Sequence, residues 1–420
     1  MERLPSDSAQ RPRGPVASRA LASVLLATLA ASCGGGGGGN ATPPPVPPPP
    51  QASDTEAVAY QMSPAHTGFV NYSQAPSFPA SPAWNVKLGQ YTSYPLIVNG
   101  KVYVVSSIGP NNYGVYLYAF DGATGATVWG PVTVAGTYVE SNLAYDGGKI
   151  FATNFDGAVT AFDAATGAQL WSVAPAGTDG SNTSGPTAVN GIVYVSIGSI
   201  ARVYALDEGT GAVRWQQPVI YGEKSTPAVT NNGVYVAYPC HYYSFDPTTG
   251  TQKWLHTLGC NGGGGYAPVA TTATVYIRDD ATGPNGQALD ALTGNLLRAY
   301  PVDNSPAIDG TSMYLVSNGI LSAADPASGS TLWSFADPAG AGFVTSPVVI
   351  NSFVVVGTAA GQLYAVNAKS GAQAWTGSAG TTIPAADPSL AIPLIAMASA
   401  DHLLVVPTDS GLTAWSLAAQ

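Results

Sequence analysis

A repeat with a period near 40 residues is the sequence feature that most constrains this fold. One copy runs from Ala119 through Asp121, Thr124 and Gly125 to Trp129, and so reads Ala-x-Asp-x-x-Thr-Gly-x-x-x-Trp. Successive Asp or Asn positions of the repeat lie 35 to 44 residues apart. This spacing is typical of one four-stranded blade of a β-propeller.

Seven copies of the repeat share an Asp or Asn four residues before a Gly, and six of them have a Trp four residues after that Gly. The copies are Asp121, Gly125 and Trp129; Asp163, Gly167 and Trp171; Asp207, Gly211 and Trp215; Asp246, Gly250 and Trp254; Asp290 and Gly294; Asp325, Gly329 and Trp333; Asn367, Gly371 and Trp375. Arg298 replaces the Trp in the fifth copy. We expect the Asp to cap its own turn and the Gly to supply positive φ. A catalytic base is needed once, so an Asp in every copy indicates a structural role.

The blade count follows from the two ends of the repeat region. After Trp375 the chain has three more strands, the last around Ala414 and Trp415. Near the other end, Trp84 lies in a single strand with no strands of its own before it. We predict that this strand completes the last blade and removes an exposed sheet edge. The sequence therefore predicts an all-β, eight-bladed propeller of four-stranded antiparallel blades over residues 57–420.

Composition supports this fold class and excludes some partners. The 420 residues include 49 Gly and 34 Pro, which suit many short strands and tight turns. Beyond residue 32 the chain has 10 basic and 22 acidic residues, a net charge of −12. Such a surface repels phosphate backbones, so we expect no nucleic-acid partner.

The N-terminal region predicts export and a lipid anchor. Residues 20–31 form an uncharged apolar stretch behind an Arg-bearing leader, too short to span a bilayer and typical of a signal peptide, which we place at 1–32. Cys33 follows Ala31-Ser32 and precedes Gly34, as in the bacterial lipobox, and is the predicted lipidation site. The alternative is ordinary cleavage, with Cys33 discarded or left free. Residues 33–56, rich in Gly and Pro, are predicted to be a disordered linker.

The remaining cysteines and the histidines give no catalytic or metal-binding pattern. Cys240 and Cys260 fall in turns on the same face of the propeller, and an oxidising compartment favours a disulfide between them, with a redox-active pair as the alternative. The four histidines share no repeat position and no metal-ligand spacing; they are His66, His241, His256 and His402. We therefore predict no catalytic residues, no metal site and no cofactor.

The repeat resembles that of the pyrroloquinoline-quinone (PQQ) propeller family across about residues 57–420. The family includes periplasmic quinoprotein dehydrogenases and BamB, the propeller lipoprotein of the β-barrel assembly machinery. The dehydrogenases have a vicinal Cys-Cys pair and a Ca²⁺ site beside the quinone, and this chain has no Cys-Cys pair. The segment Ala65-His66-Thr67-Gly68 also resembles one found before the first strand of stand-alone bacterial propellers.

The combined prediction is a monomeric, non-catalytic scaffold, anchored at the bacterial cell envelope on the periplasmic side or surface of the outer membrane. It would hold a protein partner through one propeller face, in the manner that the resemblance to BamB implies. Gly-rich, weakly charged loops suit contacts with an extended peptide or strand. The alternative is a PQQ-dependent oxidoreductase that uses the central funnel. Carbohydrate binding is a third hypothesis, suggested only by the 22 Tyr.

The disulfide prediction has a direct chemical test. Alkylation of the protein without a reductant, followed by mass spectrometry, is expected to leave Cys240 and Cys260 unlabelled, because paired sulfurs have no thiol to alkylate. Two labelled thiols at these positions would exclude the pair.

Overall fold

The computed structural model describes residues 52–89, 92–109, 112–136, 138, 140–177, 180–181, 183–220, 224–259, 267–278, 286–386 and 394–419. All of them lie in one compact unit, Val46–Gln420. Within the described residues no helix is long and apolar enough to cross a membrane.

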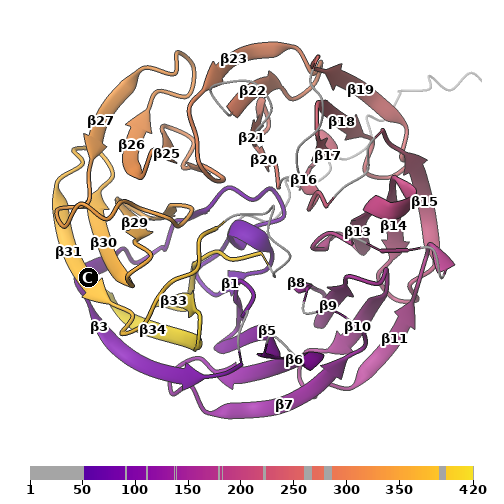
Figure 1. Cartoon of the computed structure of the whole chain (residues 1–420), viewed down its shortest axis with the longest axis horizontal. Helices are drawn as coiled ribbons and strands as arrows, with labels where there is room; N and C mark the ends of the chain where they lie inside the picture. Colours follow the sequence, from indigo (N-terminus) through magenta and orange to yellow (C-terminus); the bar gives the residue numbers. More distant parts are fainter. Residues whose placement is uncertain are drawn as a thin grey trace, which may run out of the picture. The chain divides into compact units, whose positions relative to one another are not determined.

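Eight sheets stand around a common centre, which confirms the predicted eight-bladed propeller (Figure 1). From the centre outward, the strands of blades 1 to 4 are β4 (Leu96–Val98), β5 (Lys101–Gly109), β6 (Asn112–Asp121) and β7 (Thr127–Val134); β8 (Ser141–Asp146), β9 (Lys149–Asn154), β10 (Val159–Asp163) and β11 (Gln169–Val173); β12 (Thr187–Val189), β13 (Ile192–Ile197), β14 (Arg202–Asp207) and β15 (Val213–Pro218); β16 (Ala228–Thr230), β17 (Gly233–Tyr238), β18 (His241–Phe245) and β19 (Gln252–Thr257).

Blades 5 to 8 have the same order from the centre outward. Their strands are β20 (Val269–Ala270), β21 (Thr274–Arg278), β22 (Gly286–Asp290) and β23 (Leu296–Tyr300); β24 (Ala307–Ile308), β25 (Met313–Ser317), β26 (Ile320–Ala324) and β27 (Thr331–Phe335); β28 (Val348–Ile350), β29 (Phe353–Gly357), β30 (Gln362–Asn367) and β31 (Gln373–Ser378); β32 (Ala398–Ala400), β33 (Leu403–Thr408), β34 (Gly411–Ala419) and β3 (Pro76–Lys87). Short 3₁₀ turns are η1 (Tyr60–Met62) and η3 (Gly198–Ile200).

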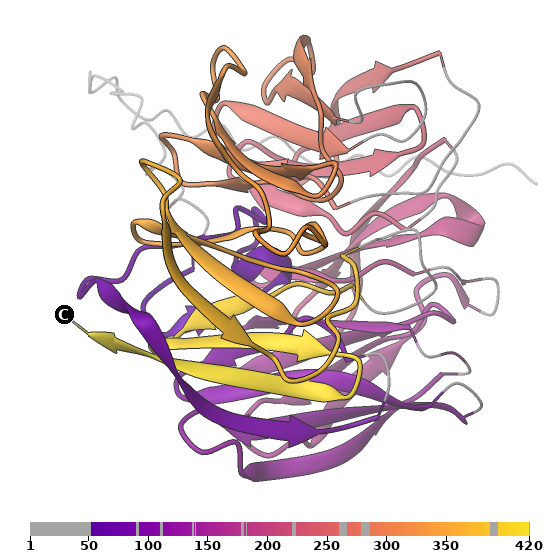
Figure 2. The ribbon, with the colours of Figure 1, turned by 60° about the vertical axis from the view of Figure 1, so that its left-hand side comes forward.

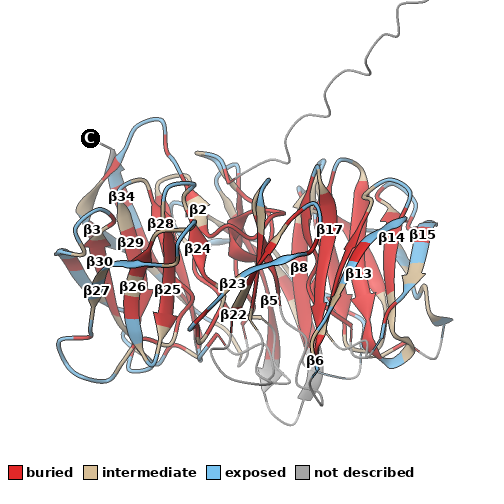
Figure 3. Cartoon of the chain, turned by 90° about the horizontal axis from the view of Figure 1, so that it is seen from above, coloured by how far each residue is buried: buried red, intermediate tan, exposed pale blue. Residues whose placement is uncertain are grey.

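The propeller has two different faces. The turn face bears the turns between the first and second and between the third and fourth strands of each blade. The loop face bears the turns between the second and third strands and the links to the next blade. Buried residues concentrate inside the blades, while exposed residues line the faces and the outermost strands (Figure 3).

The N-terminal strand closes the ring as predicted. In β3, Trp84 pairs with Ala414 of β34, and the antiparallel register extends from Pro76 opposite Ala419 to Lys87 opposite Gly411. In Figure 2 the indigo β3 runs beside the yellow C-terminal strands. Blade 8 thus contains three C-terminal strands and one N-terminal strand.

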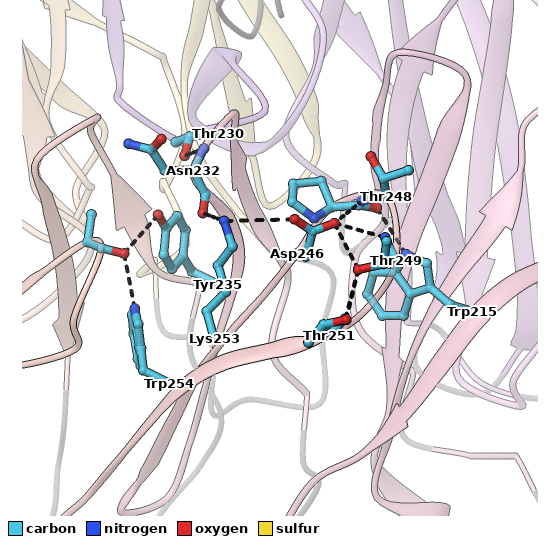
Figure 4. A network of polar contacts seen from close by, with 12 residues as sticks. Trp215, Thr230, Asn232, Tyr235, Asp246, Thr248, Thr249, Thr251, Lys253 and Trp254 are labelled. Atoms are coloured by element: carbon cyan, nitrogen blue, oxygen red, sulfur yellow. Dashed lines mark hydrogen bonds and ion pairs between the residues drawn. The ribbon is translucent and has the colours of Figure 1, made fainter. Parts of the chain in front are cut away.

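Each repeat Trp packs on the following blade. The ring of Trp215 lies against Gly250 of blade 4, where an added Cβ would come within 2.6 Å of the indole. The indole N–H of Trp215 donates to the carbonyl of Pro247 in the same turn at 2.9 Å (Figure 4). Five more Trp donate to the equivalent carbonyl at 2.7–3.2 Å, with the pairs Trp84–Gly122, Trp129–Ala164, Trp171–Glu208, Trp254–Ala291 and Trp333–Ala368.

The repeat Asp or Asn caps the turn that receives this Trp. In blade 4, Asp246 Oδ1 accepts from the backbone N–H of Thr249 at 2.9 Å and from its hydroxyl at 3.1 Å (Figure 4). The same bonds to the residue three positions on form at the other six copies, Asp121, Asp163, Asp207, Asp290, Asp325 and Asn367. Hydrogen bonds from Thr124 lower the pKa of Asp121, as expected for a carboxylate that serves as a cap.

Two positions replace the Trp contact with a different one. Arg298 lies over Gly329 of blade 6, as an indole does, but it donates to the carbonyl of Ala327 at 3.2 Å, one residue beyond the carbonyl that the Trp residues bond. Trp375 faces blade 8, whose outer strand comes from the N-terminus and not from a turn. It packs instead against Phe78 and the buried Trp415, with ring centroids 5.6 and 6.1 Å away.

The Trp–Gly contact predicts a difference between two glycines. Gly250 (φ +70°) faces the Trp215 ring, whereas Gly148 (φ +83°) has nothing within 4 Å of an added Cβ. Both Ala variants carry the left-handed backbone cost, but only Gly250→Ala crowds an indole. We expect Gly250→Ala to lower the free energy of unfolding by about 1–3 kcal/mol more than Gly148→Ala does. Urea denaturation measures both, and equal losses would contradict a tight blade contact.

Candidate functional site

The central axis, where a funnel is expected, is occupied by the chain's own N-terminal segment. Residues 52–73, which we call the plug, precede β3 and pass through the middle of the ring. β1 (Glu56–Ala57) adds to β4 in antiparallel fashion, and β2 (Phe69–Val70) adds to β28 in parallel fashion. Between them η1 lies near the centre of the ring (Figure 1).

The plug is held by backbone hydrogen bonds from blade after blade. In each bond an N–H at or beside an innermost strand donates to a plug carbonyl, at 2.6–3.0 Å. The donor and acceptor pairs are Asn99–Thr55, Tyr145–Val58, Val229–Pro64, Ala270–Ala65, Ile308–Thr67, Val349–Gly68 and Asp401–Asp54. Seven of the eight blades supply at least one such donor, with blade 7 adding Asn351–Val70 at 3.0 Å, and blade 3 is reached through a side chain of the plug, described next.

His66 is the side chain of the plug that reaches blade 3. It is completely buried, with Nδ1 2.8 Å from the carbonyl oxygen of Pro268 and Nε2 3.4 Å from the hydroxyl of Thr187. The Pro268 carbonyl can only accept, so Nδ1 carries the proton. Burial lowers the pKa of His66 to about 4, and the ring is neutral at ordinary pH.

The plug changes two expectations about the chain. Residues 52–56 were expected in the disordered linker 33–56, but Ala52 is buried and Glu56 pairs with Val98, so this part belongs to the fold. The oxidoreductase alternative expects an open central funnel. Backbone N–H groups at the innermost strands instead donate to the plug in that space.

The axis is also filled toward the loop face. Tyr60 of the plug, Ala267 before β20 and Ala396 before β32 belong to one buried apolar cluster, although they come from different sides of the ring. The backbone N–H of Leu394 donates to the amide oxygen of Asn142 at 2.8 Å, which ties blade 8 to blade 2. Apolar packing thus continues across the centre of the molecule.

These residues do not fit a quinone in the central funnel. The space on the axis is taken by Tyr60, Met62 and His66, each 3% exposed or less. Within the part of the chain that the structure describes, no three His, Cys, Asp or Glu side chains lie close enough to hold a metal ion. We therefore derive no reaction step through a quinone.

The cysteines and the remaining histidines form no metal-binding cluster among the described residues. Cys33 and Cys260 fall outside the described residues, while Cys240 is disulfide-bonded and its backbone is left-handed (φ 62°). Its pairing with Cys260 stays a prediction. His241 begins β18, and His256 on β19 stacks on Tyr242 at 5.9 Å. His402 stacks on Tyr72 of the plug at 4.7 Å.

Two cavities open beside the filled axis. One, of about 410 Å³, lies on the turn face between blades 8 and 1 and is lined by Asp121, Asp401 and His402, among others. The other, of about 210 Å³, lies on the loop face, where Arg278 and Asn304 contribute polar groups. Sequence patterns did not indicate either cavity, because the lining residues come from separate turns and links. Within the plug, the segment Ala65-His66-Thr67-Gly68 resembles a segment of stand-alone bacterial propellers, but this resemblance did not indicate that it lies on the axis.

Comparison with known proteins gives a family. The model of the family described as outer membrane protein assembly factor BamB matches residues 67–199, 155–313 and 317–420. The chain belongs to this family. The BamB of Moranella endobia (strain PCIT) is 27% identical over 216 residues, 47% of this chain and 54% of that protein. The serine/threonine-protein kinase AfsK of Streptomyces griseus is 40% identical over 74 residues, 16% of this chain and 9% of that protein. The chain thus spans about half of the first relative and under a tenth of the second.

Solved structures share the fold. BamB from Moraxella catarrhalis has a TM-score of 0.61 at 18% identity, covering 80% of this chain and all of that one. A europium-containing methanol dehydrogenase gives 0.66 at 18% identity, with 86% and 90% covered. The quinohemoprotein alcohol dehydrogenase of Comamonas testosteroni gives 0.65 at 14% identity, with 86% and 80% covered. At these identities the likeness concerns the propeller alone.

The buried His66 predicts a pH dependence of stability. Its pKa is lowered to about 4 in the fold, against an ordinary value of 6.5, so the unfolded chain binds the proton more readily. The contribution of His66 is complete above pH 6.5 and is lost as the pH falls toward 4. Between pH 7 and 4.5 we expect the wild type to lose about 2 kcal/mol more unfolding free energy than His66→Asn. Denaturant titrations at both pH values test this, and equal losses in the two proteins would contradict it.

Proposed function

We propose that this chain is an exported, lipid-anchored scaffold that binds a protein partner at the bacterial outer membrane, as its relationship to BamB suggests. The filled axis is the single observation that supports this most. A propeller whose centre is packed with its own chain offers its faces and rim to other molecules and leaves no funnel for a quinone. The predicted signal peptide and Cys33 supply the export and the anchor.

The loop face is the surface that we propose for the partner. It bears the links between blades, which are rich in Gly, Ser and Ala. Among its described residues is a partly buried ion pair, in which Lys224 Nζ lies 2.6 Å from Glu140 Oε2 and joins the links that precede blades 4 and 2. The turn face, by contrast, carries the repeat carboxylates. Gly-rich links leave main-chain groups available to an extended protein segment.

Site-specific photo-crosslinking in native membranes tests the proposal. A photoreactive residue at Tyr138 or Ile220, both exposed in links of the loop face, is expected to capture a discrete protein. The same residue at Thr210 or Lys369, exposed in turns of the opposite face, is the matched control. Equal capture from both faces, or capture from neither, would count against a loop-face partner.

A further inference from the structure

The larger of the two cavities lies on the turn face, at the seam where blade 8 meets blade 1. Among its lining residues, blade 1 contributes Gly100 and Asp121, and blade 8 contributes Asp401, His402 and Leu403. Its volume of about 410 Å³ falls within the roughly 300–1,000 Å³ that is typical of ligand pockets. The cavity lies on the face opposite the one proposed for the protein partner, so it is a separate candidate site.

Gly100 connects the two carboxylates of this cavity. Its N–H donates to Asp401 Oδ2 at 2.5 Å, and its carbonyl accepts from the N–H of Gly122, the neighbour of Asp121, at 2.7 Å. An added Cβ on Gly100 would have nothing within 4 Å, so the space beside it is open. Asp121 and Asp401 therefore line one open volume from two different blades.

Each of these carboxylates has one oxygen left for a ligand. Asp121 Oδ1 accepts from the N–H and the hydroxyl of Thr124 at 2.9 and 2.7 Å, whereas its Oδ2 accepts no hydrogen bond from the described residues. Asp401 uses Oδ2 for the N–H of Gly100, and its Oδ1 likewise accepts none from the described part of the chain. Both residues are partly exposed.

The charges at the cavity favour a cation. Burial raises the pKa of Asp401, and a bound cation would offset that cost of burial. The bonds from Thr124 and, to a smaller extent, the charge of Lys101 lower the pKa of Asp121, but Lys101 does not line the cavity. The net negative charge of the chain draws cations toward its surface as well.

The turn that brings Asp401 and His402 to the cavity differs from the same turn of other blades. Both residues have a left-handed backbone, with φ of 51° and 55°. Blades 1 and 3 have Asn and Gly at these two positions, namely Asn99-Gly100 and Asn190-Gly191. A residue with a side chain in place of the Gly carries a backbone cost, and such costs are common at ligand sites. The stability of the turn alone does not explain this pair.

We propose that this cavity binds the guanidinium group of a small organic cation. The free oxygens of Asp121 and Asp401 accept its N–H groups from two sides, in charge-assisted hydrogen bonds. The alkyl part of the ligand packs on the wall that Leu403 forms. A free alkylguanidine and the side chain of an arginine residue share this chemistry.

Calorimetric titration of the purified full chain tests the site directly. The probes are butylguanidinium, N-acetyl-arginine amide and the uncharged isostere N-acetyl-citrulline amide. We expect the citrulline probe to bind about tenfold or more weakly than the arginine probe, because it loses the charge-assisted bonds. Tighter binding of the arginine probe than of butylguanidinium identifies an arginine residue as the ligand, and equal or weaker binding identifies a free guanidine. No binding, or equal binding of the arginine and citrulline probes, overturns the proposal.

Two variants locate the binding in this cavity. Asp121→Asn and Asp401→Asn are each expected to weaken the arginine probe about tenfold or more, because each removes one of the two charges. The first variant keeps its cap, since Asn367 Oδ1 caps the equivalent turn of blade 7. The second places Asn where blades 1 and 3 already have Asn99 and Asn190.

Asp163→Asn is the matched control. It removes the same charge from the same cap position in blade 2, outside the cavity, and is expected to leave the affinity unchanged. Equal weakening by this variant would indicate diffuse attraction to an acidic face and would overturn the local site. The comparison of arginine with citrulline uses the wild type, so it holds whatever the variants do. Failure of the site leaves the proposed loop-face partner untouched.

Discussion

The antiparallel pairing of β3 with β34 is the constraint on which the rest of this structure depends. It supplies the fourth strand of blade 8 and brings Trp84 against Gly125 of blade 1, so the blade-to-blade contact passes through the seam. The plug requires the same closure, because its carbonyls accept from blades all around the ring. The plug and β3 follow one another in the chain. The plug binds the innermost strands, and β3 forms the outermost strand of blade 8.

Local chemistry explains why the sequence predicts so much of this ring. The Asp, Gly and Trp of each repeat lie within ten residues of one another. The Asp and the Gly shape their own turn, and the Trp packs on the equivalent Gly of the next blade. The Asp cap, the positive φ of the Gly and the indole contact therefore follow from spacing alone. Arg298 extends the rule in part, since its Cδ and Nε lie over Gly329 as an indole does, while its hydrogen bond goes to Ala327, a different carbonyl of the same turn.

The plug and the loop-face cavity lay beyond such reasoning for a physical reason. The plug binds through backbone carbonyls, which every residue has, and its paired strands are two residues long, too short for a hydrophobic period. Arg278, Asn304 and Phe343 are brought together by links of different blades, and none of them belongs to a repeated position.

The pairing of the plug and β3 with the last blade has a consequence for how the chain acquires its structure. Synthesis proceeds from the N-terminus, so the plug and β3 emerge well before the blades that hold them. Trp84 pairs with Ala414, more than 300 residues later, and the carbonyl of Asp54 accepts from the N–H of Asp401. Contacts this distant in sequence form slowly. The plug and β3 therefore lack their partners until the final blade is made.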